Sequence, residues 1–145
     1  MILFSRVRGL PVVTDGEAGR LGVVRDLTVD AAAGAVTRLR VRRGRLRGEA
    51  APAWQDVIAV RADRLVVRPG AGEDTAEGPS HHDLLGRRVL TETGEERGTV
   101  LDAAFDPVTG RIETIRTTLA ELPADRMLGL GDHALVVRAT RTDRV

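Results

Sequence analysis

The chain has 145 residues, of which 42% are hydrophobic and only 2% aromatic, and it contains neither cysteine nor lysine. This length fits one ordinary domain or two very small ones, and the lack of cysteine excludes disulfide bonds, thiolate metal sites and thiol nucleophiles. The net charge of +1 hides an asymmetry, because residues 1–68 carry 13 Arg and 7 acidic residues (+6) whereas residues 69–145 carry 9 Arg and 14 acidic residues (−5). Oppositely charged halves can steer docking or self-association.

The first residues, Met1 to Arg6, have no basic segment followed by a long apolar one, so we expect no signal peptide. No window of the chain approaches the roughly 20 apolar residues that span a bilayer. We therefore expect a soluble, cytoplasmic protein that does not insert into a membrane.

The first half contains signals for short strands and turns. Its motif is Gly22-x-Val24-x-Asp26. We expect a turn from Asp30 to Gly34 after it, because an Asp side chain can hydrogen-bond its own backbone and Gly can adopt positive φ. Leu39 and Val41 then alternate with arginines, which is the period of a half-buried strand. Residues 52–57 fit a single short helical turn.

The second half repeats this pattern after a segment rich in Gly, Pro and acidic residues. That segment cannot bury enough apolar surface to offset its ordering entropy, so we predict a flexible linker over 69–82 between modules at 1–68 and 83–145. Two stretches, 22–36 and 98–112, match at a constant offset of 76. The matched pairs are Gly22 and Gly98, Val24 and Val100, Asp26 and Asp102, Asp30 and Asp106, Gly34 and Gly110, and Val36 and Ile112.

Further strands complete the second copy. Leu101, Ala103 and Phe105 alternate with small or polar residues, which is the period-2 pattern of a half-buried strand. Residues 123–127 fit a second short helical turn, and paired Val/Leu strands close each copy. The pattern predicts an all-β fold with at most short helical turns.

With its opening strand, its Gly-x-Val-x-Asp motif, its Asp-to-Gly turn and its proline-led helical turn, each copy resembles the PRC-barrel domain family. The resemblance implies two tandem small β-barrels packed together. The plan is similar to small stand-alone two-copy proteins of actinobacteria. Members of the family generally act as docking modules, so the resemblance also implies a non-catalytic adaptor.

The candidate polar sites have structural alternatives. Asp26, Asp30, Asp102 and Asp106 could form carboxylate pairs for acid–base chemistry or cation binding. Their recurrence at one spacing favours a structural signature instead, shared with Gly22, Gly34, Gly98 and Gly110. His81 and His82 are adjacent and lack further ligands at metal spacing, and residues 129–134 match a dinucleotide fingerprint without the helix that it needs. We expect no catalytic residue, cofactor or metal site.

Two features point to a binding surface. Arginines at 38, 40, 42, 43, 45 and 47 lie on one predicted hairpin and could contact phosphates. Arg40, Arg42, Arg43, Arg45, Arg47 and Trp54 are accordingly the candidate interaction residues. Trp54 is either a core or hinge residue or, if exposed, an interface anchor.

We therefore predict a non-enzymatic docking protein that binds a protein partner or associates with itself, with a homo-oligomer as one form. RNA or ribosome association through residues 38–47 is the alternative, and DNA is not an expected partner.

Overall fold

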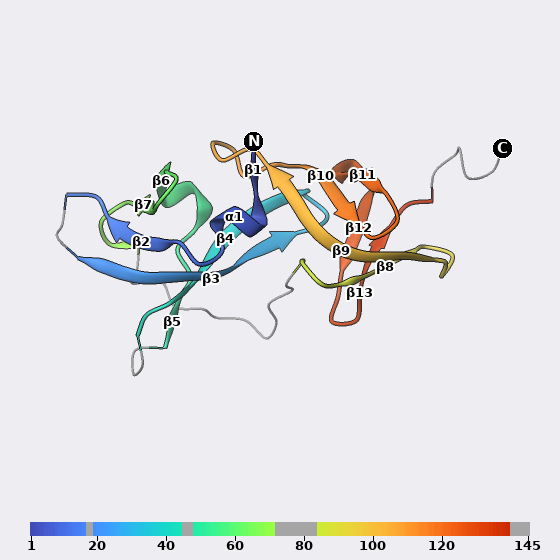
Figure 1. Ribbon diagram of the computed structural model, residues 1–145, viewed down its shortest axis with the longest axis horizontal. Helices are drawn as coiled ribbons and strands as arrows, with labels where there is room; N and C mark the ends of the chain where they lie inside the picture. Colours follow the sequence, from blue (N-terminus) through green and yellow to red (C-terminus); the bar gives the residue numbers. More distant parts are fainter. Residues whose placement is uncertain (17–18, 45–47, 72–83, 140–145) are drawn as a thin grey trace.

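The computed structural model describes residues 1–16, 19–44, 48–71 and 84–139. It contains two sheets side by side, one from each half of the chain (Figure 1). The strands of the first sheet are β2 (Pro11–Thr14), β3 (Arg20–Asp30), β4 (Ala35–Arg42), β5 (Glu49–Ala50), β6 (Val57–Val60) and β7 (Leu65–Val67). Those of the second are β8 (Arg88–Thr91), β9 (Glu96–Phe105), β10 (Ile112–Thr117), β11 (Glu121–Pro123), β12 (Met127–Leu130) and β13 (Ala134–Val137).

The two sheets have the same topology. The first runs β5-β4-β3-β2-β7-β6 and the second β11-β10-β9-β8-β13-β12. In each, one pair of neighbouring strands is parallel (β2 with β7, β8 with β13), and the other neighbouring pairs in these orders are antiparallel. Two short 3-10 helices, η1 (Trp54–Asp56) and η3 (Ala124–Arg126), lie where the sequence predicts helical turns. The predicted all-β fold of two tandem modules is confirmed.

A β-bulge in the Gly-x-Val-x-Asp motif changes which side chains face the core. On β9, Asp102 and Val100 pair with consecutive residues of β10, so Leu101 is the extra residue of the bulge. The bulge interrupts the period-2 pattern expected for Leu101, Ala103 and Phe105, because Ala103 and Phe105 are buried whereas Leu101 is 49% exposed and Asp102 is buried. In the first module, Arg25 occupies the same bulge position between Val24 and Asp26.

The first residues join the two modules. Ile2–Leu3 forms β1, which pairs with β9 of the second sheet, and Phe4–Val7 forms the short helix α1. Figure 1 shows α1 between the two sheets, and it contacts both β3 and β9. The sequence predicted an opening strand within the first module but not this crossing to the second.

The start of the predicted linker is ordered. Ala71 is buried in the core cluster, and its backbone N–H donates to the carbonyl of Arg68. The remainder of the predicted linker, 72–82, lies outside the described residues. The core itself is one cluster of mainly Val, Leu and Ala side chains that includes residues of both modules.

The motif glycines serve the fold for partly different reasons in the two copies. A Cβ atom on Gly22 would lie 2.2 Å from the carbonyl oxygen of Arg42, so β3 and β4 approach too closely for a side chain. Gly98 has a φ of +88°, which L-residues rarely adopt. A Cβ atom on Gly98 would also lie 2.3 Å from the Thr118 hydroxyl, so close packing restricts the motif position in both copies and backbone conformation restricts it further in the second.

We predict that Gly22→Ala lowers the free energy of unfolding by about 1–3 kcal/mol, because the obstructing atom is backbone and must shift. Urea denaturation measures this. Gly131→Ala is the matched control, since a Cβ there meets nothing within 4 Å. The control should change stability by less than about 1 kcal/mol. Equal effects of the two substitutions would contradict the packing argument.

Candidate functional site

The two modules meet through a reciprocal pair of backbone hydrogen bonds. The N–H of Val36 donates to the carbonyl of Gly110, and the N–H of Ile112 donates to the carbonyl of Gly34, each over 2.8 Å. The repeat offset of 76 converts one bond into the other, because it relates Gly34 to Gly110 and Val36 to Ile112. Between the two bonds, a bridge joins Ala35 to Arg111, the residue that the same offset relates to it. One segment therefore contacts its own copy, which is the arrangement of a two-fold interface. We call this contact region the seam.

The repeated aspartates shape the turns and bulges that lead to the seam. Asp30 and Asp106 each accept a bond from a backbone N–H inside their turn, and these turns end at Gly34 and Gly110. The buried Asp26 and Asp102 each accept the N–H of the following residue over 2.8 Å.

Asp102 also links the two halves of the chain. Its carboxylate accepts the backbone N–H of Ser5 over 3.1 Å and the Ser5 hydroxyl. Each of these carboxylates therefore has a partner in the fold. Within the described part of the chain, no three His, Asp or Glu side chains gather to hold a metal ion. His81 and His82 lie outside that part.

Trp54 lies in the seam. It is only 4% exposed, its indole N–H donates to the carbonyl of Pro107 over 3.1 Å, and its ring meets Phe105 edge to face at 5.2 Å. Phe105 meets Phe4 in the same way at 5.2 Å. Trp54 on η1 and Phe4 on α1 come from the first half of the chain, and Phe105 on β9 comes from the second. The two ring contacts therefore connect the two modules. Of the two roles considered for Trp54, the structure places it in a core position between modules rather than on an exposed surface.

The predicted basic segment does not present all of its charges to solvent. Arg40 is 6% exposed and lies 3.4 Å from the Glu49 carboxylate, so its guanidinium faces the module and not an outside partner. Arg42 is exposed and Arg43 half-buried, and both line a hollow of about 520 Å³ together with Arg20. Arg45 and Arg47 lie outside the described residues.

Glu49 binds two arginines on neighbouring strands. Arg25 donates a hydrogen bond to one of its oxygens, and Arg40 approaches the other. Burial raises the pKa of Glu49, but the hydrogen bond from Arg25 and the positive charges of Arg40 and Arg25 outweigh it, so the pKa is lowered from its ordinary value. Through Glu49, the bulge residue Arg25 and the buried Arg40 both interact with the short strand β5.

Family comparison agrees with this arrangement. The model of the PRC-barrel domain matches residues 1–74 and 80–141. The chain belongs to the PRC-barrel family. No curated protein matches it. PRC-barrel domains are known as protein-interaction modules, and the two sheets described above are two domains of this family in tandem.

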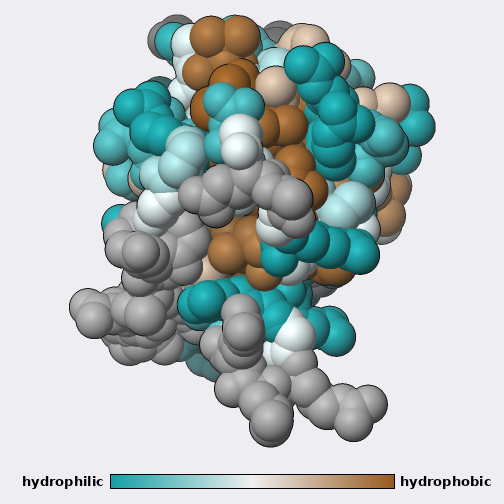
Figure 2. All heavy atoms as spheres, turned by 90° about the vertical axis from the view of Figure 1, so that its left-hand side faces the viewer, coloured by the Kyte–Doolittle hydropathy of each residue, from teal (hydrophilic) through white to brown (hydrophobic). Residues whose placement is uncertain are grey.

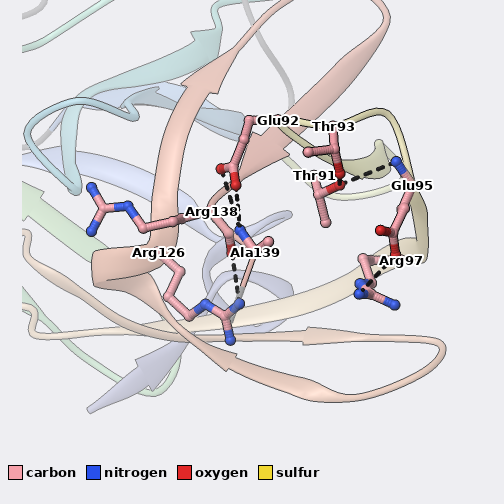
Figure 3. A network of polar contacts seen from close by, with 8 residues as sticks. All are labelled: Thr91, Glu92, Thr93, Glu95, Arg97, Arg126, Arg138 and Ala139. Atoms are coloured by element: carbon pink, nitrogen blue, oxygen red, sulfur yellow. Dashed lines mark hydrogen bonds and ion pairs between the residues drawn. The ribbon is translucent and has the colours of Figure 1, made fainter. Parts of the chain in front are cut away.

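The second PRC-barrel module has a polar network at the end of β8 (Figure 3). The hydroxyl of Thr91 accepts the N–H of Glu95, while the Glu92 carboxylate accepts the N–H of Ala139 over 3.0 Å. Arg126 donates to the carbonyl of Arg138. These bonds hold the β8–β9 turn and the end of β13 together, and most go to backbone groups, which indicates a structural role.

The PRC-barrel pair also exposes apolar side chains beside β1. Met1 is 76% and Leu3 42% exposed, and both line two hollows, one on each module. The first, of about 430 Å³, adds Leu10 and Val60, and the second, of about 330 Å³, adds residues of β9 and β10. Figure 2 shows apolar side chains in a band that runs downward from the upper edge of the molecule between hydrophilic ones. We call Met1, Leu3 and the two hollows the β1 ridge.

The β1 ridge could not be predicted from the sequence, because a two-residue strand is too short for its periodicity to be recognised. Among the described residues, no helix has the length and apolar character needed to cross a bilayer.

We predict that Glu49→Gln destabilises the protein by about 1 kcal/mol at pH 7, the upper range for a partly exposed ion pair. A lowered folded pKa means that ionised Glu49 stabilises the fold above its unfolded pKa of about 4.3, and that this contribution is lost as the pH falls through the folded pKa. The stability difference between wild type and variant should therefore shrink as the pH is lowered below about 4.3. Urea denaturation across this pH range measures it.

Glu96→Gln provides the control for this titration. Glu96 and its partner Arg88 are both largely exposed, with side chains 67% and 58% accessible. Their pair should contribute less than about 0.5 kcal/mol. A Glu49→Gln difference that stays constant from pH 7 to about pH 3 would show that the ion pair is not its source.

Proposed function

We propose that the protein is a non-catalytic docking protein in which the two PRC-barrel modules act as one body, and that a protein partner binds across the β1 ridge. The observation that carries this proposal is the pair of hollows that share Met1 and Leu3, one formed with each module. A partner seated there would contact both modules at once. The cytoplasmic location and the actinobacterial origin stay predictions from the sequence.

The composition of the ridge suits a protein partner. Exposed apolar patches rimmed by polar residues mark interaction surfaces, and Met and Arg are enriched in interfaces. Arg6 and Arg61 lie at the first hollow, and Arg116 and Glu121 at the second. A partner with an apolar centre and a mixed-charge rim would complement this surface. A second copy of the chain is one such partner, and a different protein is another.

The internal contacts of the ridge support a fixed geometry. Ile2 and Leu3 pair with Phe105 and Ala104 of β9, and the following residue, Phe4, is fully buried. Leu3 therefore has a defined backbone position while its side chain remains exposed. Such preorganisation reduces the entropy that a partner must overcome on binding.

We expect Leu3→Glu to reduce binding of the partner at least tenfold, because it places a charge at the centre of the apolar surface. The immobilised full chain is used for affinity capture with quantitative mass spectrometry, and sedimentation measures self-association. Leu119→Glu is the matched control, since Leu119 is 68% exposed and lines neither hollow. A monomeric protein that retains no specific partner, or equal capture by Leu3→Glu, would overturn the proposal.

RNA association is a second candidate, favoured by one observation. Arg20, Arg42 and Arg43 surround a single hollow of about 520 Å³ at the end of the first module. Guanidinium groups gathered in this way can contact phosphates. The case is weaker than for the ridge. Arg40 is buried and does not face phosphates outside the module, and the three aromatic rings are buried in the seam, where they do not stack on bases.

If RNA is the partner, affinity for a structured ribosomal RNA fragment should fall steeply with salt, and Arg42→Glu should weaken it severalfold. Fluorescence anisotropy at several salt concentrations measures both effects. Arg138→Glu makes the same charge change at an exposed arginine of the second module and should have little effect. Binding that ignores salt, or that both variants weaken equally, would eliminate this candidate.

A further inference from the structure

The two modules differ at one position beside the seam. Trp54 begins η1 and Ala124 begins η3, and these two short helices occupy the same place in the two topologies. Each packs on the corresponding strand, η1 on β4 and η3 on β10. Where the first module has the largest side chain, the second therefore has one of the smallest.

The surroundings of Trp54 are repeated around Ala124. Trp54 lies against the turn at Pro107 and Gly110, and a Cβ atom on Gly110 would lie 3.0 Å from its indole Cδ1. The repeat offset of 76 relates these turn residues to Ala31 and Gly34, which lie beside Ala124. A Cβ atom on Gly34 would meet nothing within 4 Å. The position that the indole fills on one side of the seam is thus open on the other.

The opening is a hollow of about 200 Å³. It is lined by residues 31–34 of the first module and by Arg111, Ile112, Ala124, Asp125 and Met127 of the second. Pockets for drug-sized ligands enclose roughly 300–1,000 Å³, so this hollow suits a single side chain better than a whole metabolite. We call it the Ala124 hollow.

The chemistry of the Ala124 hollow also repeats that around Trp54. The indole N–H of Trp54 donates to the carbonyl of Pro107, and the repeat offset relates Pro107 to Ala31, which lines the hollow. The Ala31 carbonyl accepts a bond from Gly34 at 3.2 Å, and a carbonyl oxygen has a second lone pair. Arg111 and Asp125 at the exposed rim can contact the backbone on either side of an inserted residue.

We infer that the Ala124 hollow binds an aromatic side chain, of the tryptophan type, carried by a partner protein. This chain does not supply the occupant itself. Its three aromatic residues, Phe4, Trp54 and Phe105, are all buried in the seam, and it has no tyrosine. A second copy of the folded chain is excluded for the same reason. The occupant must come from a different protein, in the way that indole anchors fill pockets at many interfaces.

This inference deepens the proposed docking function by stating the chemistry of one contact, at a place separate from the β1 ridge. Its test uses ¹⁵N-labelled full chain titrated with N-acetyl-tryptophanamide and followed by NMR. We expect saturable shifts of the amide signals of Gly34, Ile112 and Ala124. N-acetyl-leucinamide, which has the same backbone groups without the ring, should shift them at least tenfold less at equal concentration.

Two variants locate the binding. Ala124→Trp should fill the hollow from within, as Trp54 does, and should weaken the response to N-acetyl-tryptophanamide at least tenfold. Ala120→Trp adds the same ring at an exposed alanine that does not line the hollow and should leave the response unchanged. Should Ala124→Trp fail to fold, Ala124→Leu provides a smaller filling and should weaken the response in the same direction.

The inference is overturned if the seam amides do not shift, if the leucine probe shifts them equally, or if Ala120→Trp loses the response as well. Its failure is distinguishable from failure of the docking function. A partner captured equally by wild type and Ala124→Trp would contradict the Ala124 hollow while leaving docking in place. Indole binding without any captured partner would support the hollow and contradict the ridge.

Discussion

The structure depends on the reciprocal contact between the turns that end at Gly34 and Gly110. A barrel of this size buries only a modest share of its surface and is marginally stable alone. The paired backbone bonds from Val36 and Ile112 hold the modules in one orientation, and the rings of Phe4, Trp54 and Phe105 fill the space beside them. Contacts with the neighbouring module therefore supply much of the stability of each module.

One short motif produces this contact. The bulge at Arg25 and at Leu101 turns the following aspartate inward, where its carboxylate bonds the next backbone N–H. Each long strand then continues, bent by the bulge, to an Asp-to-Gly turn at the seam. The repeated aspartates thus direct strand geometry. Asp26 and Asp102 resemble catalytic carboxylates because both roles place an acid at a buried position with defined neighbours.

The sequence predicted the duplication, the all-β modules and the two helical turns, because these depend on local patterns and on the offset of 76. It did not predict the burial of Arg40, since the bulge changes the register and Glu49 supplies a partner across the sheet. It missed β1 because that strand depends on a partner about a hundred residues away. The correspondence of Trp54 with Ala124 was hidden because the second copy is shorter between β10 and η3, so a constant offset does not align them.

The two-fold seam has a consequence for how such a chain can diversify. If two separate, identical modules met in this way, every substitution would occur on both sides of the axis at once. In a single chain that restriction is absent. One side of the two-fold axis can then keep a large ring that packs between the modules, while the symmetry-related position carries a small side chain. A single gene can in this way encode a symmetric scaffold with two unlike ends, of which only one is left open to other molecules.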